Sequence, residues 1–170
     1  EEYRTAGTAP SGTANAGGLG ILCADACESV GLTLLPLADA TVEQLRAVLP
    51  AEASTGNPID MLGSAVGSSY AAVLPVLLRD PGIDSVIVLF VPPVVAGADE
   101  IADAIAQAVA NEQGNEKPVL ACVISADGIP ERLLSAPVAA FSFPESAARA
   151  LGRAADRGEW LRARQGRMPD

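Results

Sequence analysis

The stretch of this chain best suited to chemistry is glycine-rich and comprises Asn15, Ala16, Gly17, Gly18, Leu19 and Gly20. It opens an apolar pattern with helical spacing, so it predicts a helix whose first N–H groups lack intrahelical acceptors. Glycines let a ligand approach the backbone closely, and the helix dipole favours an anion at this end. The stretch therefore predicts a site for a phosphoryl or similar anionic group. Glycines that only make a tight turn or close helix packing are the alternative.

Histidine is absent from all 170 residues. This excludes a Ser-His-Asp triad, a Cys-His dyad, an imidazole zinc site and a phosphohistidine on this chain. The three cysteines, Cys23, Cys27 and Cys122, form no even framework and lack further ligands at tetrahedral metal spacing. We expect them to be small core residues, with a redox or metal role as the alternative. The sequence predicts no catalytic residue and no metal site in this chain.

The charge of the chain is strongly negative and unevenly distributed. It has 11 basic and 21 acidic residues, a net charge of −10, which repels phosphate backbones and makes nucleic acid an unsuitable partner. Residues 1–144 hold five basic and 17 acidic side chains, whereas residues 145–170 hold six arginines and four acids. Arg149, Arg153 and Arg157 recur every four residues, which is typical of a solvated helix face and less often of a contact to a partner or a diphosphate.

Composition indicates an ordinary globular domain. Hydrophobic residues make up 49% and charged residues 19% of the chain, which is too apolar for overall disorder and long enough for a substantial core. No basic and apolar leader opens it, and its longest uncharged stretch is broken by glycines and a proline. We therefore expect a soluble cytoplasmic protein without a membrane partner.

Strand-like and helix-like segments alternate along the chain, which predicts an α/β fold with a parallel sheet covered by helices on both faces. A capping-box pattern, Thr41 followed by Gln44, marks one helix start. The predicted strands are 32–35, 85–91, 119–124 and 138–141. The predicted helices run from the glycines to residue 31 and over 41–49, 69–80, 99–109, 130–134 and 145–164, with Trp160 turned inward in the last.

An ordered set of motifs resembles one known family. In chain order the motifs are NAGGLGILCADACESVGL, TVEQLRAVLP, GNPIDMLGSA, DPGIDSVIVLFVPP, KPVLA and FPESAARALGRAADRGEWLRARQGRMP. Together they resemble the ligase-CoA domain of ADP-forming acyl-CoA synthetases, which is similar to the C-terminal, flavodoxin-like domain of the succinyl-CoA synthetase β subunit. The resemblance implies a three-layer flavodoxin-like domain over residues 15–170.

The resemblance also implies a reaction and its partners. In this family an acid, CoA and a nucleoside triphosphate become acyl-CoA, nucleoside diphosphate and phosphate, through an acyl phosphate and a phosphohistidine on another domain. CoA, ATP and Mg²⁺ are then expected for the complete enzyme, with none bound directly by this domain. The implied partners are CoA-binding, histidine-bearing and ATP-grasp domains or subunits, together with phosphate or acyl phosphate. We expect the isolated chain to be inactive and, through its uncovered apolar surface, able to self-associate.

Site residues follow from the motif matches. By resemblance, Asn15 to Gly20 form the helix start that faces the phosphohistidine loop, and Asn57 belongs to a loop beside the same site. Phe90, Val91, Pro92 and Pro93 match a strand-end loop where succinyl-CoA synthetases carry a glycine pair. Two prolines replace flexible N–H donors with a rigid wall, which disfavours a dicarboxylate substrate. Asn57 as an Asx turn and Asp60 as a cap are the structural alternatives.

One part of the family pattern is missing from the sequence. The family has a hydrophobic strand directly before NAGG, yet here the first 14 residues, EEYRTAGTAPSGTA, are small and polar. They read as a linker or a remnant of a preceding domain, which leaves the first strand missing or atypical unless residues 3–14 fill its place.

Two other functions remain open at this stage. A regulatory or scaffold domain of a synthetase-like module, for example one fused to a protein acetyltransferase, is the main alternative to a part of an enzyme. Flavin binding is disfavoured because aromatic residues make up only 4% of the chain.

Overall fold

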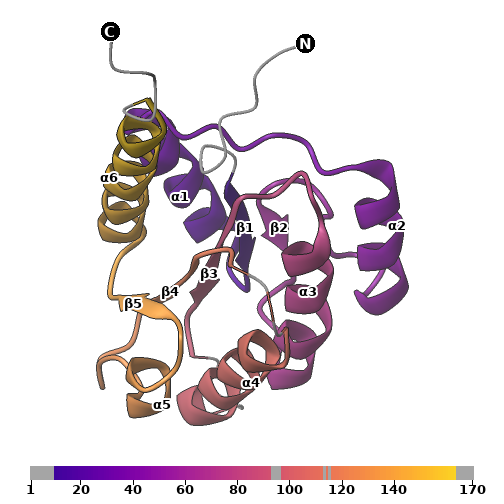
Figure 1. Cartoon of the computed structure of the whole chain (residues 1–170). Coiled ribbons are helices and arrows are strands. Elements are labelled where there is room, and N and C mark those ends of the chain that lie inside the picture. Colours follow the sequence, from indigo (N-terminus) through magenta and orange to yellow (C-terminus); the bar gives the residue numbers. More distant parts are fainter. Residues whose placement is uncertain (1–9, 93–96, 113, 115, 164–170) are drawn as a thin grey trace, which may run out of the picture.

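The structure, a computed structural model, describes residues 10–92, 97–112, 114 and 116–163. In this part of the chain five strands form one all-parallel sheet in the order β2-β1-β3-β4-β5 (Figure 1). The strands are β1 (Pro10–Ala14), β2 (Ile59–Asp60), β3 (Ser85–Phe90), β4 (Val119–Val123) and β5 (Ala139–Phe141). The helices are α1 (Gly17–Ser29), α2 (Asp39–Val48), α3 (Gly67–Arg79), α4 (Ala98–Asn111), α5 (Glu131–Leu134) and α6 (Pro144–Ala163).

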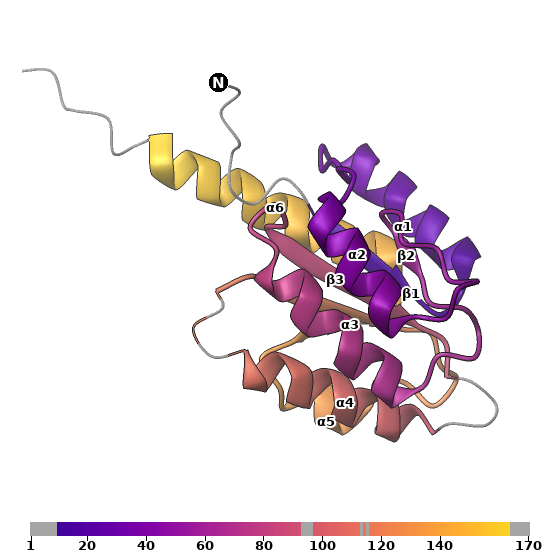
Figure 2. The same cartoon turned by 90° about the vertical axis from the view of Figure 1, so that its right-hand side faces the viewer.

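Helices cover both faces of this sheet, as the sequence predicts. Figure 2 shows α1 and α6 on one side and α3, α4 and α5 on the other, with α2 beside α3 near the β2 edge. Each side has its own apolar core, and the two cores meet only through the sheet. The three-layer α/β architecture is therefore confirmed. None of the described helices is long and apolar enough to span a bilayer.

The central strand is where the structure corrects the sequence most. Residues 10–14, which the sequence assigns to a linker unless they fill the place of the first strand, form β1 and pair with both β2 and β3. All five residues are buried, although their side chains are small or polar. The hydrophobicity of residues 10–14 does not predict this strand. In the middle of a sheet covered by helices, a strand needs small side chains wherever a neighbouring segment packs closely against it. The ideal Cβ position of Gly12, for example, lies 3.2 Å from Pro58 Cβ.

Several other elements differ from their predictions. Residues 32–35 form no strand; the second strand is instead Ile59–Asp60, inside a predicted loop. Thr41 is no N-cap, because α2 begins at Asp39 and the Thr41 hydroxyl donates to Asp80 Oδ2 at 2.6 Å. Trp160 is 43% exposed rather than inward, because the buried face of α6 ends at Ala155. Each difference reflects a tertiary contact or its absence, which local patterns do not report.

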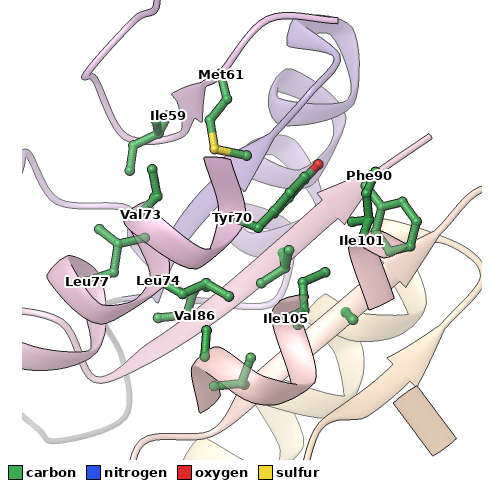
Figure 3. Close-up of a cluster of buried hydrophobic side chains, with 14 of the residues drawn as sticks. Ile59, Met61, Tyr70, Val73, Leu74, Leu77, Val86, Phe90, Ile101 and Ile105 are labelled. Carbon is green, nitrogen blue, oxygen red and sulfur yellow. The ribbon is translucent and has the colours of Figure 1, made fainter. Parts of the chain in front are cut away.

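The larger core lies between the sheet and the helices α2 to α5, and Figure 3 shows part of it. Tyr70 and Phe90 are fully buried there, with ring centroids 6.1 Å apart in an edge-to-face arrangement. The Tyr70 hydroxyl donates to the Leu89 carbonyl at 3.2 Å, so its polar end is satisfied. This contact joins α3 to the end of β3.

Some hydroxyls in the sheet have no such partner. Ser11, Thr13 and Ser85 are completely buried, and their side-chain oxygens form no hydrogen bond within the described part of the chain. Thr13 lies opposite Val88 in the parallel register, on the face that packs against the larger core. A buried hydroxyl without a partner costs about 1–3 kcal/mol, so these groups lower the stability of the sheet.

Thr13 and Thr41 are both buried, but only the Thr41 hydroxyl has a hydrogen-bond partner. This difference gives a first prediction. We expect Thr13→Val to raise the free energy of unfolding by about 1 kcal/mol, or about 3 °C in Tm, because it removes an unpaired hydroxyl at nearly constant volume. The control, Thr41→Val, removes a hydroxyl bonded to Asp80 and should lower stability by about 1–3 kcal/mol. Chemical denaturation measures both, and loss of stability in Thr13→Val would contradict the assignment.

Candidate functional site

The glycine-rich turn stands where β1 ends and α1 begins. Ala16 is the N-cap of α1 in extended conformation, and its carbonyl accepts from Leu19 N at 3.0 Å and Gly20 N at 3.4 Å. The N–H groups of Gly17 and Gly18 have no acceptor among the described residues, and both glycines are exposed. Two free donors thus sit at the positive end of a 13-residue helix. The predicted helix start with free N–H groups is present, and anion binding there stays a prediction.

Asn15 holds this turn against the loop that follows β3. Its side chain is buried, with 4% exposure, and its Oδ1 accepts from Val91 N at 3.0 Å while its Nδ2 donates to Val91 O at 2.8 Å. Both ends of the amide are therefore used within the protein. Asn15 acts as a positioning residue, which fixes the glycine turn relative to the carboxyl end of β3.

Asp60 flanks the same turn from β2. Its Oδ2 lies 2.7 Å from the position that a Cβ at Gly17 would take, and its Oδ1 accepts from Leu62 N at 2.9 Å. A side chain at Gly17 would therefore displace this carboxylate. The hydrogen bond to Leu62 agrees with the interpretation of Asp60 as a loop cap. Its second oxygen also places a negative charge beside the free N–H groups, which the sequence did not predict.

The glycines of the turn have different tasks. Gly20 is buried against Pro58, whose Cβ lies 3.4 Å from the ideal Cβ position of Gly20, so close packing explains this glycine. Gly18 has no atom within 4 Å of its ideal Cβ position. Leu19 is half-buried and packs against the core formed by α1 and α6. Only Gly17 and Gly18 present open backbone, and packing is the role of Gly20.

Asn57 lies elsewhere. Its Oδ1 accepts from Gly12 N at 3.0 Å, and its Nδ2 donates to Pro10 O at 3.1 Å and to Leu35 O at 2.9 Å. Two of these partners, Pro10 and Gly12, belong to the first half of β1, and the three residues of strand from Gly12 to Asn15 span about 10 Å. The structure therefore does not bring the Asn57 side chain to the glycine turn, although its loop reaches the turn through Pro58, which packs against Gly20. Its amide takes the place of a neighbouring strand along the part of β1 that β2 does not reach.

The predicted strand-end residues divide between core and edge. Phe90 is buried against Tyr70 and faces the larger core, away from the glycine turn. Val91 is 36% exposed, with its backbone held by Asn15, and Pro92 is half-buried. Pro93 lies outside the described residues. Val91 is the member of this set that contacts the turn, through Asn15, and Pro92 follows it in the chain.

The three cysteines match their interpretation as core residues. All are free thiols with 0% exposure in the core between α1, α6 and the sheet. Burial raises the pKa of Cys122 to about 12, and a hydrogen bond with Cys27, together with burial, raises the pKa of Cys23. The reactive thiolate is therefore disfavoured at both positions. Within the described part of the chain, no three acidic, cysteine or histidine side chains could hold a metal ion together.

The basic face of α6 is open to solvent. Arg149, Arg153 and Arg157 are exposed, and the Arg157 guanidinium lies 4.2 Å from the centre of the Trp160 ring. These arginines lie on the outer side of α6, opposite its buried alanines and Leu151. The structure shows no contact between them and the glycine turn.

The role of Asn15 leads to a prediction about stability. We expect Asn15→Leu to lower the free energy of unfolding by about 2–4 kcal/mol, because both backbone groups of Val91 lose their partner. Denaturant titration measures the change. The matched control is Asn111→Leu at the exposed end of α4, which should stay within about 0.5 kcal/mol of the original protein. Equal effects at the two positions would contradict the positioning role.

Asp60 leads to a prediction about anion affinity. Asp60→Asn keeps an oxygen that can accept from Leu62 N but removes a charge beside the Gly17 and Gly18 amides. We expect the affinity of these amides for inorganic phosphate to rise by about fivefold, since one charge at this range contributes on the order of 1 kcal/mol. Amide shifts at constant ionic strength measure it. Asp25→Asn, about 12 Å further along α1, is the control with the same change in net charge; an equal rise there would refute a local effect.

Comparison with known proteins agrees with the sequence and the fold. The curated relatives include the α subunit of ADP-forming acetate–CoA ligase II from Pyrococcus furiosus, which is 43% identical over 109 residues. That match covers 63% of this chain and 24% of the relative. ADP-forming acetate–CoA ligase I from Archaeoglobus fulgidus is 29% identical over 153 residues, covering 88% of this chain and 21% of the relative. The chain thus spans about a quarter or less of these two relatives.

Solved structures and a family model complete the comparison. A crystal structure of a protein from Pyrococcus horikoshii OT3 superposes with a TM-score of 0.83 at 36% identity, covering 89% of this chain and 36% of that protein. The model of the Ligase-CoA domain matches residues 12–166, which includes most of β1 as well as the glycine turn. The chain therefore belongs to the Ligase-CoA domain family.

Proposed function

We propose that this chain is one domain of an ADP-forming acyl-CoA synthetase and that it presents the start of α1 to a phosphoryl group carried by another domain. Family membership and the acetate–CoA ligases among its relatives support the first part. The observation that carries the second part is the pair of unpartnered N–H groups at Gly17 and Gly18. They lie beyond the carboxyl end of a central strand, where ligands bind in open α/β sheets.

The task of these residues would be electrostatic. In the complete enzyme an acid, CoA and ATP would yield acyl-CoA, ADP and phosphate, through an acyl phosphate and a phosphohistidine. The N–H groups of Gly17 and Gly18 would donate to phosphoryl oxygens, and the dipole of α1 would favour the charge that moves during transfer. Asn15 would keep the donors in place. The histidine that carries the phosphoryl group would come from a partner domain, because this chain has none.

The Asp60 carboxylate beside the turn is compatible with a phosphoryl group that is attached to a neighbouring domain. Asp60 would weaken the binding of free phosphate, so the turn by itself should bind anions loosely. A phosphoryl group attached to a neighbouring domain has a high effective concentration and needs little intrinsic affinity. Weak binding would also let the group leave for the next step. ATP, Mg²⁺ and CoA are assigned in this proposal to the other domains of the complete enzyme.

The residues after β3, at the edge beside the glycine turn, bear on which class of acid the complete enzyme would activate. Val91 contacts the turn and Pro92 follows it, and the Val91 N–H and carbonyl are both occupied by Asn15. This edge therefore offers no free backbone donor at Val91 and none at a proline, which disfavours a second carboxylate on the substrate. We propose a monocarboxylic acid, and the two relatives compared above, both named for acetate, support this class.

A matched pair of variants at Gly18 tests the proposed role. Gly18→Pro removes one N–H in the first turn, where proline is tolerated, whereas Gly18→Ala keeps the N–H and its Cβ meets no atom within 4 Å. We expect inorganic phosphate and acetyl phosphate to shift the Gly17 and Gly18 amides of the original chain. Gly18→Ala should bind with similar affinity, and Gly18→Pro at least about threefold more weakly.

Two results would count against the proposal. If phosphate leaves these amides unchanged, the glycines serve packing only and a regulatory or scaffold domain becomes the better interpretation. If the isolated chain forms acyl-CoA from acetate, CoA and ATP, the assignment of the chemistry to other domains is wrong. Circular dichroism of both variants shows whether a loss of binding comes from unfolding.

A further inference from the structure

An open pocket lies between α2 and the loop that follows it, apart from the glycine turn. Its volume is about 640 Å³, which is within the usual range of small-molecule sites. Its walls come from the second half of α2 and from residues 50–56, and it shares no lining residue with the Asn15–Gly20 turn. Figure 1 shows α2 at the β2 edge of the molecule, on the opposite side from α6.

Arg46 gives the lining of this pocket a positive charge. Of the basic side chains in residues 10–144, Arg79 pairs with Glu112, Arg132 pairs with Asp103, and Lys117 donates to the Asp80 carbonyl. Arg46 also lies in this range, and it has no ion pair or hydrogen-bond partner among the described residues. This free cation lines the pocket, in a part of the chain where acidic side chains outnumber basic ones.

Core packing and backbone hydrogen bonds hold the walls of the pocket in place. Leu45 and Leu49, on either side of Arg46, are buried in the larger core and anchor the end of α2. In the loop, Ala53 N donates to Pro50 O at 3.0 Å, and Ser54 exchanges two backbone hydrogen bonds of 3.0 Å with Asp60. Such a framework exists before a ligand arrives, which lowers the entropy lost on binding.

The chemistry of the walls indicates the class of ligand. The guanidinium of Arg46 is a planar donor that can bind a carboxylate through two parallel hydrogen bonds. Thr55 adds a hydroxyl to the pocket, and Val42, Pro50 and Ala53 add apolar surface. We propose that this pocket binds an organic carboxylate with an apolar body, its carboxylate on Arg46 and its chain against Val42 and Pro50.

The strength of binding should be modest. Arg46 is exposed, so water and salt weaken its attraction for an anion, and the acidic surroundings oppose the approach of one. We expect a dissociation constant of roughly 1 mM for a ligand of this kind. The site is separate from the phosphoryl site proposed above, and its test does not depend on that proposal.

Three probes test the ligand class by amide shifts at constant ionic strength: hexanoate, its neutral analogue hexanamide and inorganic phosphate. We expect hexanoate to shift the Arg46, Thr55 and Gly56 signals, and hexanamide and phosphate to shift them at least about tenfold more weakly. If hexanamide binds as well as hexanoate, charge recognition is absent and the proposal is wrong. If phosphate binds as well as hexanoate, the pocket does not select organic carboxylates and the proposal is equally wrong.

Three variants test the roles of Arg46 and Thr55, one of them a control. Arg46→Gln should reduce hexanoate affinity by about tenfold or more, since it removes a charged hydrogen-bond donor from an exposed position without loss of core packing. Arg132→Gln, which alters an exposed arginine elsewhere, should leave hexanoate affinity unchanged. Thr55→Val should cause a smaller loss, because it removes one neutral donor. Unchanged affinity in Arg46→Gln, with an unchanged thermal unfolding curve, would overturn the proposal.

Discussion

The pairing of β1 between β2 and β3 is the constraint on which the rest of the structure depends. This strand has five residues, all buried, and it links the edge formed by β2 to the rest of the sheet. Its backbone must be satisfied on both sides, because water does not reach it. β3 pairs with its whole length, whereas β2 pairs only with Thr13 and Ala14. The Asn57 side chain completes the pairing by bonding Gly12 N and Pro10 O.

The small side chains of β1 follow from this position. Pro58 stands against Gly12 and, on the next element, against Gly20 of α1, so the strand and the helix share one contact surface. Larger side chains at these glycines would separate α1 from the sheet. The same contact sets where α1 begins, and therefore where its free N–H groups point. The candidate site is in this sense a consequence of how β1 is packed.

Around the glycine turn, the structure separates residues that hold the turn from residues that remain available. Asn15 and Asp60 both have hydrogen bonds to backbone groups of neighbouring segments, which keeps the turn close to the ends of β2 and β3. Gly17 and Gly18 retain free donors because no acceptor of the described chain forms a hydrogen bond with them, although the Asp60 carboxylate lies beside Gly17. These backbone donors can bind and orient an anion but do not themselves transfer protons, and the carboxylate beside them belongs to Asp60.

The order of strands and helices from α3 onward could be predicted from the sequence. The run Ser85–Phe90 and the periodic apolar residues of α3, α4 and α6 carry strong local signals. Membership of the family was also recognisable, because several motifs occur in a set order. The segments at 10–14 and 59–60 had no such signal. Small or few residues become strands there because adjacent strands supply their hydrogen bonds.

By itself the sequence determined the α/β class, the glycine-rich start of α1 and the absence of histidine chemistry, because these depend on residue types and local spacing. Only the tertiary structure decided which polar residues are occupied and which are free. Asn57 serves β1, Asn15 serves Val91, and Arg46 remains free at a pocket. The reason is physical: a hydrogen bond between residues 76 positions apart, such as that of Asn15 with Val91, depends on how the strands are ordered, and strand order is not written in any local pattern.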